Sequence, residues 1–480
     1  MAVLFSLLLH TLVLLLEQAS AATWPLTDAG LPAPGSIQTF YMSSRNLWLN
    51  RQLWQEGHTE LRPSIRRILR LADGAVMDTK SYSVSSKNSS LSAPSNDPHD
   101  YYSLSPFYWP TAANVQATDP IPGGPYARFD GYTNPEVYLY QDPQYMQLML
   151  DDVLHCSLAY FFTGNETYAA TATRRLSSWF VDPVTAMKPS MEYAASVRGV
   201  DVTQASPTVD LATSNGTKTA DATGVLMDMN KIYLLIDSVG LIRGSSSFTP
   251  DHYKGIQTWI QSYQTWSMTH HRAKTFGASV NYQGSWFDVQ QVSMLLFLNK
   301  TTEAAAVITQ SSLSRMALQI ASKDGSQPLE LARPLSWFSA TYNLEALFVL
   351  GFLAHSASVD LFKFVDATTG EQTIASALKY MIPFAQTNGA GWPTPNIGKF
   401  DSAPIAELCK LAFVVYRDDS YLNAVTAMQA KPKTWNPVRL WTPYLAFDTA
   451  KKSSAEILSV RNAGLLVASI ALMWISSTLF

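Results

Sequence analysis

Cysteine and charged residues are both scarce in this chain. Two cysteines occur among 480 residues, so a framework of disulfides cannot hold the fold. Charged residues make up 15% of the chain and the net charge is -3, which gives no general attraction to nucleic acid. The alternation of apolar and polar residues that marks half-buried strands is also rare. These absences exclude a disulfide-stapled scaffold, a basic nucleic-acid-binding protein and a mainly β fold.

Helical periodicity dominates the chain after residue 140. Apolar residues recur there at spacings of three and four, and 47% of all residues are hydrophobic, enough for a well-buried interior. Successive helical hairpins predict an all-α fold, an incomplete (α/α) toroid with long loops forming a cleft. Two stretches, 80–98 and 183–220, are unpatterned and predict irregular loops. The expected helices are 144–163, 166–181, 224–243, 250–271, 286–299, 301–321, 340–357, 373–386 and 404–418.

The beginning of the chain has the pattern of a secretory signal. An apolar run from Val3 to Leu16 precedes the small residues Ala19, Ser20 and Ala21, which stand at the spacing of a cleavage site. We therefore expect residues 1–21 to be a signal peptide and the mature protein to begin at Ala22.

The end of the chain has the pattern of a glycosylphosphatidylinositol (GPI) anchor signal. The chain is apolar from Gly464 to Phe480 and stops inside that run, whereas a membrane span normally has polar flanks on both sides. Small residues from Ser453 to Ala455 and a short spacer precede the run. We expect residues 453–480 to be removed, leaving one domain over 22–452; a single-pass tail anchor is the alternative.

These two signals predict a protein that is secreted and held by a lipid anchor at the outer surface of a eukaryotic cell. Sequons for N-linked glycans fit that compartment, although each tripeptide is a weak signal by itself. The two cysteines lie in apolar helical stretches, so both a disulfide and two buried free thiols remain open. The sequons begin at Asn88, Asn165, Asn215 and Asn299, and the cysteines are Cys156 and Cys409.

The segment HDYYSLSPFYWP, residues 99–110, is the densest aromatic stretch of the chain. Pro106 and Pro110 forbid a helix interior, so the segment is expected to be a loop or extended chain. Flat rings beside hydroxyl groups, an imidazole and a carboxylate suit a sugar, whose C–H faces stack on rings and whose hydroxyls need partners. The alternative is an aromatic loop that closes a core.

Further segments follow in order along the chain. They are YARFDGYTNPE (126–136), VNYQGSWFDVQ (280–290) and DGSQPLELARPLSW (324–337), the last running into TYNLEALF (341–348). Together with the aromatic stretch, this series resembles the alginate lyase superfamily of polysaccharide lyases over roughly residues 60–420. With the two terminal signals, the resemblance indicates a secreted eukaryotic, fungal member.

The resemblance implies an (α/α) toroid with a cleft across its mouth and β-elimination of a uronic-acid-containing polysaccharide. The implied partner is an anionic polysaccharide, and the family's usual mechanism implies no metal and no other cofactor. Such a reaction needs donors that hold the carboxylate and stabilise the charge that develops beside it. It also needs a base for the proton on C5 and an acid for the departing oxygen O4.

The third and fourth segments match the family's pattern only in part. Where the family has Asn-Asn-His-Gly, this chain has Asn281, Tyr282, Gln283 and Gly284. Gln283 can donate to a carboxylate but cannot exchange protons. In the fourth segment Glu330, Arg333 and Trp337 fit, whereas the family's His-Tyr pair is replaced by Phe338 and Ser339.

We expect Asn281, Gln283 and Arg333 to hold the carboxylate and Tyr342 or Tyr282 to move the proton. A tyrosine normally titrates near pH 10, so Arg333 would have to lower the pKa of the phenol. The alternatives are that Tyr342 is a core residue, that Tyr282 is a surface aromatic, and that Arg333 pairs with Glu330 three residues earlier.

The expected substrate-binding residues are aromatic or carry an imidazole. Tyr108 and Trp109 are expected to stack on sugar rings. His99 would donate to a carboxylate or carry a proton, with bracing of its loop as the alternative. Tyr102 matches the family's cleft loop, and Trp286 belongs to the third segment.

Two rival functions stay open from the sequence. The first is a catalytically impaired binding protein on the same scaffold, because the family's His and Tyr positions hold Gln283 and Ser339. The second is a glycoside hydrolase, which needs a pair of acidic residues flanking the cleft. No spacing singles out such a pair among Asp100, Asp130, Asp288 and Glu330.

Overall fold

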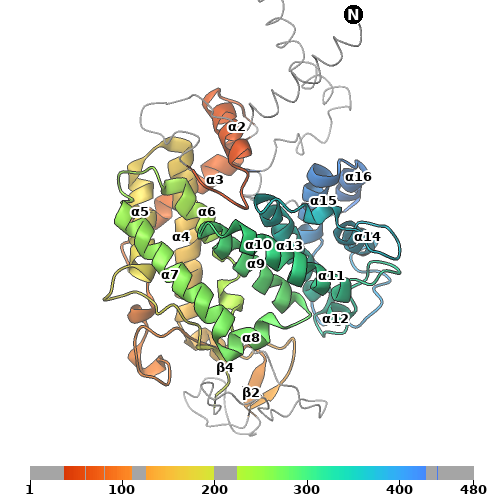
Figure 1. The fold of residues 1–480 in the computed structure, drawn as a ribbon, viewed down its shortest axis with the longest axis horizontal. Helices are drawn as coiled ribbons and strands as arrows, with labels where there is room; N and C mark the ends of the chain where they lie inside the picture. Colours follow the sequence, from red (N-terminus) through yellow and green to blue (C-terminus); the bar gives the residue numbers. More distant parts are fainter. Residues whose placement is uncertain are drawn as a thin grey trace, which may run out of the picture.

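The computed structural model describes residues 37–59, 61–80, 82–110, 126–198, 224–428 and 440–441. Helices dominate these residues, and Figure 1 shows them arranged in two neighbouring groups. The first group holds α2 (Ser44–Gln55), α3 (Arg62–Met77), α4 (Asp142–Thr163), α5 (Glu166–Phe180), α6 (Ile232–Ile242), α7 (Pro250–Thr269) and α8 (His271–Gly277). The second holds α9 (Tyr282–Phe297), α10 (Thr301–Ala306), α11 (Leu313–Gln319), α12 (Pro328–Leu331), α13 (Ser336–Ser356), α14 (Thr373–Gln386), α15 (Ala403–Tyr416) and α16 (Ser420–Ala427).

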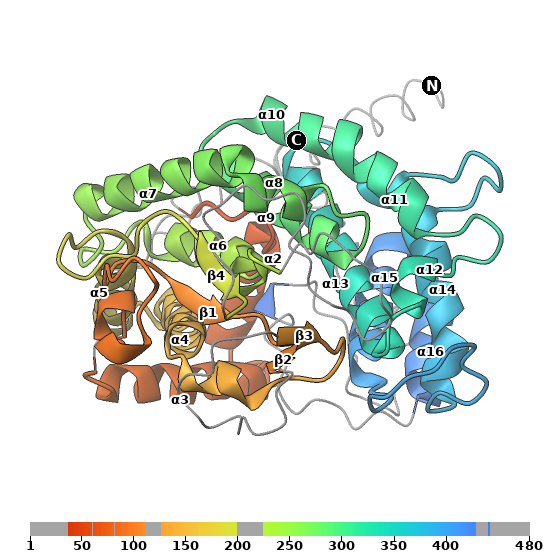
Figure 2. The same cartoon turned by 90° about the horizontal axis from the view of Figure 1, so that it is seen from below.

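The strands are short and pair in twos, one pair beside α4 and α6 and the other toward the second group of helices (Figure 2). β1 (Tyr102–Leu104) pairs in parallel with β4 (Tyr193–Ser196). β2 (Tyr108–Pro110) pairs antiparallel with β3 (Tyr126–Arg128). The prediction that residues 99–110 are loop or extended chain is therefore confirmed.

The helices expected after residue 140 are confirmed, with one correction at residues 224–231. That stretch forms a short 3-10 turn, Met227–Met229, and α6 begins only at Ile232. The helix expected at 301–321 is a continuous rod in which a π-helical stretch, Val307–Ser312, joins α10 to α11. α2, α3, α8, α12 and α16 were not predicted from the apolar periodicity.

Local sequence signals set several helix ends. α4 stops at Gly164, which has a φ of 71°, in the left-handed region that glycine adopts without strain. Asn165 then caps α5 by accepting a hydrogen bond from the Thr167 amide. At α7, Thr249 and His252 form a reciprocal capping box. The polar turns between hairpins thus begin and end helices by satisfying free backbone groups.

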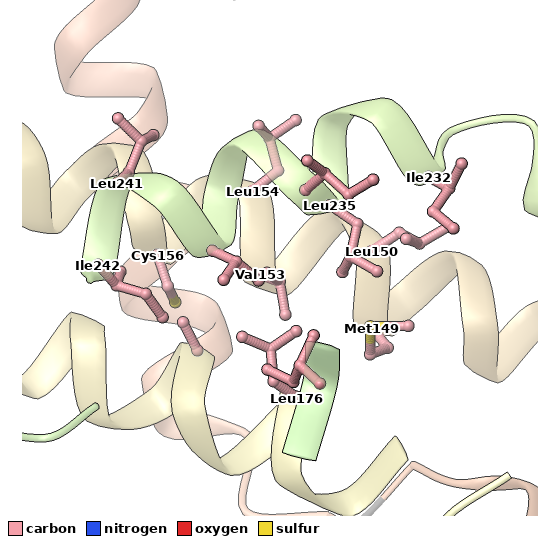
Figure 3. Close-up of a cluster of buried hydrophobic side chains, with 14 of the residues drawn as sticks. Met149, Leu150, Val153, Leu154, Cys156, Leu176, Ile232, Leu235, Leu241 and Ile242 are labelled. Atoms are coloured by element: carbon pink, nitrogen blue, oxygen red, sulfur yellow. The ribbon is translucent and has the colours of Figure 1, made fainter. Parts of the chain in front are cut away.

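Two apolar clusters form the core, one mainly from α2 to α8 and one mainly from α9 to α16. In the first, α4 is surrounded by its neighbours, and Figure 3 shows Met149, Val153 and Leu154 of α4 among side chains of α5 and α6. Cys156 lies in this cluster and Cys409 in the other, so both are buried free thiols. Burial raises the pKa of each thiol to about 12.

α13 is long and apolar enough to cross a membrane, the one such helix in the part of the chain that the structure describes. Over its most apolar 18 residues, 78% are buried inside the protein. Its apolarity therefore fits its place in the second core cluster, where Leu344, Leu347 and Leu350 are buried.

A segment near the start of the described chain links the two groups of helices. The buried carboxylate of Asp237 on α6 accepts hydrogen bonds from the amides of Phe40, Tyr41 and Met42 at 2.6 to 3.0 Å. The carbonyl of Phe40 accepts a hydrogen bond of 2.8 Å from Ser356 at the end of α13. Burial raises the pKa of Asp237 to about 7, although the three amides lower it.

The predicted signal peptide and anchor signal lie outside the described residues, as does Asn215. The other sequon asparagines, Asn88, Asn165 and Asn299, are exposed. A glycan at any of these three positions would not have to enter the core.

Replacing Asp237 with alanine should destabilise the protein strongly. The substitution leaves three backbone donors without an acceptor next to the core, and we expect the free energy of unfolding to fall by roughly 3 kcal/mol or more. Urea denaturation followed by circular dichroism measures this. Asp366, which accepts amide hydrogen bonds from Thr368 and Thr369 at the surface, is the matched control. A loss in Asp366→Ala as large as that in Asp237→Ala would contradict the argument.

Candidate active site

The start of α9 carries the third sequence segment and is held by an arginine from α11. The side chain of Asn281 caps the helix by accepting a 3.0 Å hydrogen bond from the Gln283 amide. Arg315 donates to the carbonyls of Gly277 and Ser279 in the preceding turn and binds both carboxylate oxygens of Asp288, at 3.0 and 3.2 Å. This guanidinium therefore joins the turn to the helix that follows it.

Gly284 is required by this arrangement. A Cβ atom at this position would overlap the guanidinium of Arg315 and the carbonyl oxygen of Ser279. The glycine of the third segment thus has a packing role, because it leaves the space through which Arg315 reaches the turn.

A buried network of amide and hydroxyl groups joins α9 to α13. Ser285 of α9 hydrogen-bonds Asn343 of α13 at 2.7 Å and accepts from Gln319 of α11 at 2.8 Å. Asn343 donates to Gln327 at 2.8 Å, and Gln319 also donates to the carbonyl of Asn281 at 3.0 Å. All four side chains are fully buried, so each pairing fixes how the two helices sit against each other.

Aromatic side chains from α9 and α13 meet beside this network. The ring of Tyr342 lies 5.6 Å from that of Tyr282, 5.0 Å from that of Trp286 and 5.3 Å from that of Phe338. Tyr282 is 8% exposed and Trp286 4% exposed, whereas Phe338 is 55% exposed. The group therefore runs from the core to the surface, with Phe338 at its outer end.

Arg333 brings a positive charge to this aromatic group. Its guanidinium carbon lies 4.9 Å from the centre of the Tyr282 ring. The same guanidinium donates a 2.7 Å hydrogen bond to Asp130, in the loop after β3. The sequence left open an ion pair between Arg333 and Glu330. The structure pairs Arg333 with Asp130 instead.

Glu330 contacts the backbone of Tyr282. Its Oε1 accepts a 2.6 Å hydrogen bond from the Tyr282 amide, the first amide of α9. Its Oε2 is buried and has no hydrogen-bond partner among the described residues. The site thus contains a buried carboxyl with one free oxygen.

Burial and charge act in opposite directions on the titrating groups. The pKa of Tyr282 is raised overall, because burial outweighs the lowering effect of Arg333, and Glu330 and Asp130 raise it further. Burial also raises the pKa of Tyr342, whose hydroxyl accepts a hydrogen bond from Asn230. Burial raises the pKa of Glu330 to about 7, with the Tyr282 amide and Arg333 opposing. Of the two phenols, Tyr282 is the one beside a cation.

The hairpin of β2 and β3 lies against the segment that follows Arg333. The indole nitrogen of Trp109 donates a 2.9 Å hydrogen bond to the carbonyl of Tyr132. Gly131, next to Tyr132, has a φ of 82° and lies so close to Pro334 and Leu335 that a Cβ would crowd both. Trp109 is therefore connected to the site through this loop.

The other residues expected to bind substrate have partners elsewhere. Tyr108 is 3% exposed and packs with Tyr126 and Val197, which leaves its ring no free face. Tyr102 stands edge-on to Tyr140 with ring centres 5.0 Å apart. The structure gives neither tyrosine a contact with the Tyr282 group.

The side chains of His99 and Trp286, which were also expected to bind substrate, have contacts within the protein. The Nδ1 atom of His99 lies 2.6 Å from the Ala186 carbonyl, the arrangement expected of a histidine that braces its loop. Trp286 lies between Tyr342 and Tyr233 and supports the aromatic group from inside. Gln283 is half-buried at the start of α9, with its Oε1 3.4 Å from the Ser279 hydroxyl.

Asn230 and Asp130 belong to this site but were not predicted to do so from the sequence. Asp130 stood in a recognised segment but was weighed only as an acid for hydrolysis. Asn230 carries no local signal, because its contact with Tyr342 joins positions 112 residues apart. Asp100 and Asp288, weighed for the same acid role, are bound to Lys188 and Arg315. No group of three or more potential metal-binding side chains occurs among the residues that the structure describes.

A sequence model of the alginate lyase family matches residues 84–392, which is more than half of the chain and spans all of these segments. The chain belongs to the alginate lyase family. A crystal structure of an alginate lyase from Bacteroides ovatus is 25% identical in sequence, with a TM-score of 0.73, over 84% of this chain and 99% of that one. The all-α fold built as an (α/α) toroid is thereby confirmed.

More distant similarity extends to alginate lyase A1-III from Sphingomonas species A1, at 12% identity and a TM-score of 0.49, over 90% of this chain and 100% of that one. A variant of A1-III in complex with a tetrasaccharide is similar at 11% identity and a TM-score of 0.48, over 90% and 99%. No curated protein sequence matches the chain.

Substituting Gly284 should damage this family member more than an ordinary glycine substitution does. An added methyl group has to displace Arg315 from the turn or from buried Asp288, so we expect Gly284→Ala to reduce the free energy of unfolding by about 2–4 kcal/mol. Gly74 on α3 has open space around it and is the matched control. Gly74→Ala should stabilise the helix by about 0.5–1 kcal/mol. Equal melting temperatures for the two variants would refute the packing role of Gly284.

Proposed function

We propose that this protein is a polysaccharide lyase that cleaves a uronic-acid-containing glycan by β-elimination. The observation that carries the proposal is the position of the Arg333 guanidinium, 4.9 Å from the ring centre of Tyr282, in a member of the alginate lyase family. A tyrosine acts as a base only as a phenolate, and a neighbouring guanidinium favours that form.

The reaction removes the proton from C5 of the uronate and breaks the bond between C4 and O4. The electron pair of the C5–H bond forms the C4–C5 double bond, and O4 leaves with a proton. Asn281 and Gln283 carry amide groups suited to holding the uronate carboxylate while negative charge develops beside it. Arg333 neutralises charge on the phenolate and on the substrate.

Tyr282 is the proposed base, and Tyr342 is proposed to support it. Tyr282 faces Arg333, whereas the hydroxyl of Tyr342 already accepts a hydrogen bond from Asn230. Once Tyr282 has taken the C5 proton, it is a neutral phenol beside the departing oxygen and can return that proton to O4. Tyr282 can therefore serve both as the base and as the acid. The reaction then does not need the family's His and Tyr, whose positions are held here by Gln283 and the buried Ser339.

The surface next to the proposed base favours sugar binding by stacking. Phe338 and Tyr132 are each 55% exposed, and Trp109 is half-buried beside Tyr132. We propose that these rings contact the sugars that flank the cleaved bond. His99, held by the Ala186 carbonyl, and Tyr102, packed against Tyr140, are proposed to support the loop that carries Trp109. The buried faces of Tyr108 and Trp286 fit a supporting role better than a direct contact.

We also propose that the protein acts outside the cell that makes it, as a secreted eukaryotic, fungal glycoprotein held by a GPI anchor. The apolar segments at both ends of the chain support this placement. The exposed sequon asparagines Asn88, Asn165 and Asn299 are compatible with glycosylation.

Tyr282→Phe should abolish the reaction while leaving the fold intact. Loss of a general base lowers kcat by roughly 100-fold or more, so the ultraviolet absorbance of the unsaturated uronate should nearly disappear. Tyr342→Phe should lose much less activity, and Tyr138→Phe, at an exposed tyrosine, should lose none.

Several results would contradict this assignment. Retained activity in Tyr282→Phe with loss in Tyr342→Phe would make Tyr342 the base. Binding of polyuronates without any unsaturated product would identify a binding protein. New reducing ends without the unsaturated chromophore would identify a hydrolase.

Glu330 should set the pH dependence of the reaction. With its pKa raised to about 7, Glu330 is negative above that pH and opposes ionisation of Tyr282. Glu330→Gln removes the charge and keeps an oxygen for the Tyr282 amide. The rising limb of kcat/KM against pH should therefore move to lower pH in this variant. Exposed Glu303→Gln is the control and should leave the profile unchanged.

Glu330→Gln also tests how the ionisation of Glu330 changes the stability of the protein with pH. The pKa of Glu330 is higher in the folded protein than its ordinary value, so the folded state binds this proton more tightly than the unfolded state. The stability that this group contributes is complete at low pH and is lost as the pH rises through about 7. Glu330→Gln should therefore lose less stability than the natural protein between about pH 5 and pH 8. Parallel loss in both proteins would show that Glu330 ionises normally.

A further inference from the structure

The exposed face of α3 carries a concentration of positive charge that the proposed reaction does not use. Arg62, Arg66, Arg67 and Arg70 are all exposed, within nine residues of a chain whose net charge is -3. Residues four apart stand above one another on a helix, so Arg62, Arg66 and Arg70 form one row, with Arg67 beside it. We call these four residues the arginine face of α3.

Little within the protein neutralises this face. In the part of the chain that the structure describes, the side chains of Arg66, Arg67 and Arg70 make no ion pair or hydrogen bond. Arg62 donates to the carbonyl of Gly57. Asp73, the acidic residue of α3, accepts a 2.7 Å hydrogen bond from the Tyr168 hydroxyl. Since like charges four residues apart destabilise a helix, an external anion is the natural partner for this row.

The opposite face of α3 is committed to the core. Ile65, Ile68, Ala72 and Ala75 are buried in the first apolar cluster. A helix that lies in a membrane surface inserts its apolar face into the lipid, and α3 has no such face available. Met77, at the end of the helix, is the exposed large apolar side chain of α3. The groups that α3 offers to an external partner are therefore mainly the guanidinium groups of its arginine row.

We propose that the arginine face of α3 is a second binding site for acidic polysaccharide, separate from the active site. Guanidinium groups bind carboxylates and sulfates through two parallel hydrogen bonds, and a polymer with a charge on each repeat engages several arginines at once. Figure 1 shows α3 beside α2, with β2 at the opposite end of this half of the molecule. Polymer bound here stays attached to the protein after the active site releases a product. The choice of ligand rests on the proposed function.

Binding of the full-length protein to long polyuronates tests this site without requiring catalysis. The probes are alginate, polygalacturonate and polyglucuronate, and the measurement is affinity electrophoresis at several salt concentrations. The test variant carries Arg→Gln at positions 62, 66, 67 and 70. The control carries Lys→Gln at the exposed positions 254, 323, 363 and 379, which removes the same charge from scattered sites.

The arginine variant should bind long polymer roughly tenfold more weakly at low salt, with a shallower dependence on salt, because it forms fewer ion pairs. The control should change less than twofold. Equal weakening in both variants, or no change in the arginine variant, overturns the proposal. Circular dichroism checks that both variants fold, as expected for substitutions at exposed positions.

Two further measurements separate this proposal from its alternatives. The arginine variant should show a higher KM for long polymer and unchanged kinetics on a tetrasaccharide. If no polymer yields an unsaturated product, the proposed function fails, while the binding result still decides whether the second site exists.

Vesicles containing phosphatidylserine test a membrane as the partner. Loss of vesicle binding with unchanged polysaccharide binding in the arginine variant overturns the proposal.

Discussion

The buried pairing of Ser285 with Asn343 is the contact on which the site depends. Apolar packing holds α9 against α13 but does not fix how far one helix slides along the other. Buried amides and hydroxyls do fix the relative position of the two helices, because a shift of one helix would leave each polar group without a hydrogen-bond partner. Gln319 and Gln327 complete the same network. Since Tyr282 lies one turn from Ser285 and Tyr342 is next to Asn343, the network sets the distance between the two phenols.

Around Tyr282, the structure balances burial against charge. Desolvation favours the neutral phenol, and Arg333 is the principal group that favours the phenolate. The carboxylate of Asp130 orients that guanidinium through a 2.7 Å hydrogen bond and at the same time reduces its effect on the phenol. Glu330 holds the backbone of Tyr282 and adds a charge whose presence depends on pH. The proposed chemistry therefore depends on these four side chains acting together. Because Gln283 and Ser339 stand where the family has His and Tyr, proton transfer falls to Tyr282, the phenol beside Arg333.

Prediction from sequence succeeded where the physical cause was local. The helices after residue 140 followed from apolar spacing, and Pro106 and Pro110 correctly indicated extended chain. α2 was not predicted; its buried Asn50 donates to the carbonyl of Leu440, 390 residues away. Prediction failed again before α6, where residues 224–231 form a short 3-10 turn instead of an α-helix and Asn230 reaches Tyr342 of α13. In each case the stretch contacts a segment that lies far away in the chain.

The sequence by itself determined the fold class, the family resemblance and the residue types available for the reaction, because periodicity and motif order are properties of the chain. Only the tertiary structure decided that Tyr282 rather than Tyr342 stands beside Arg333, that Arg333 pairs with Asp130, and that the ring of Tyr108 is enclosed. It also separated the arginine face of α3 from the active site. The reason is that ionisation and access depend on distances between residues far apart in the chain, and those distances exist only once the helices have packed.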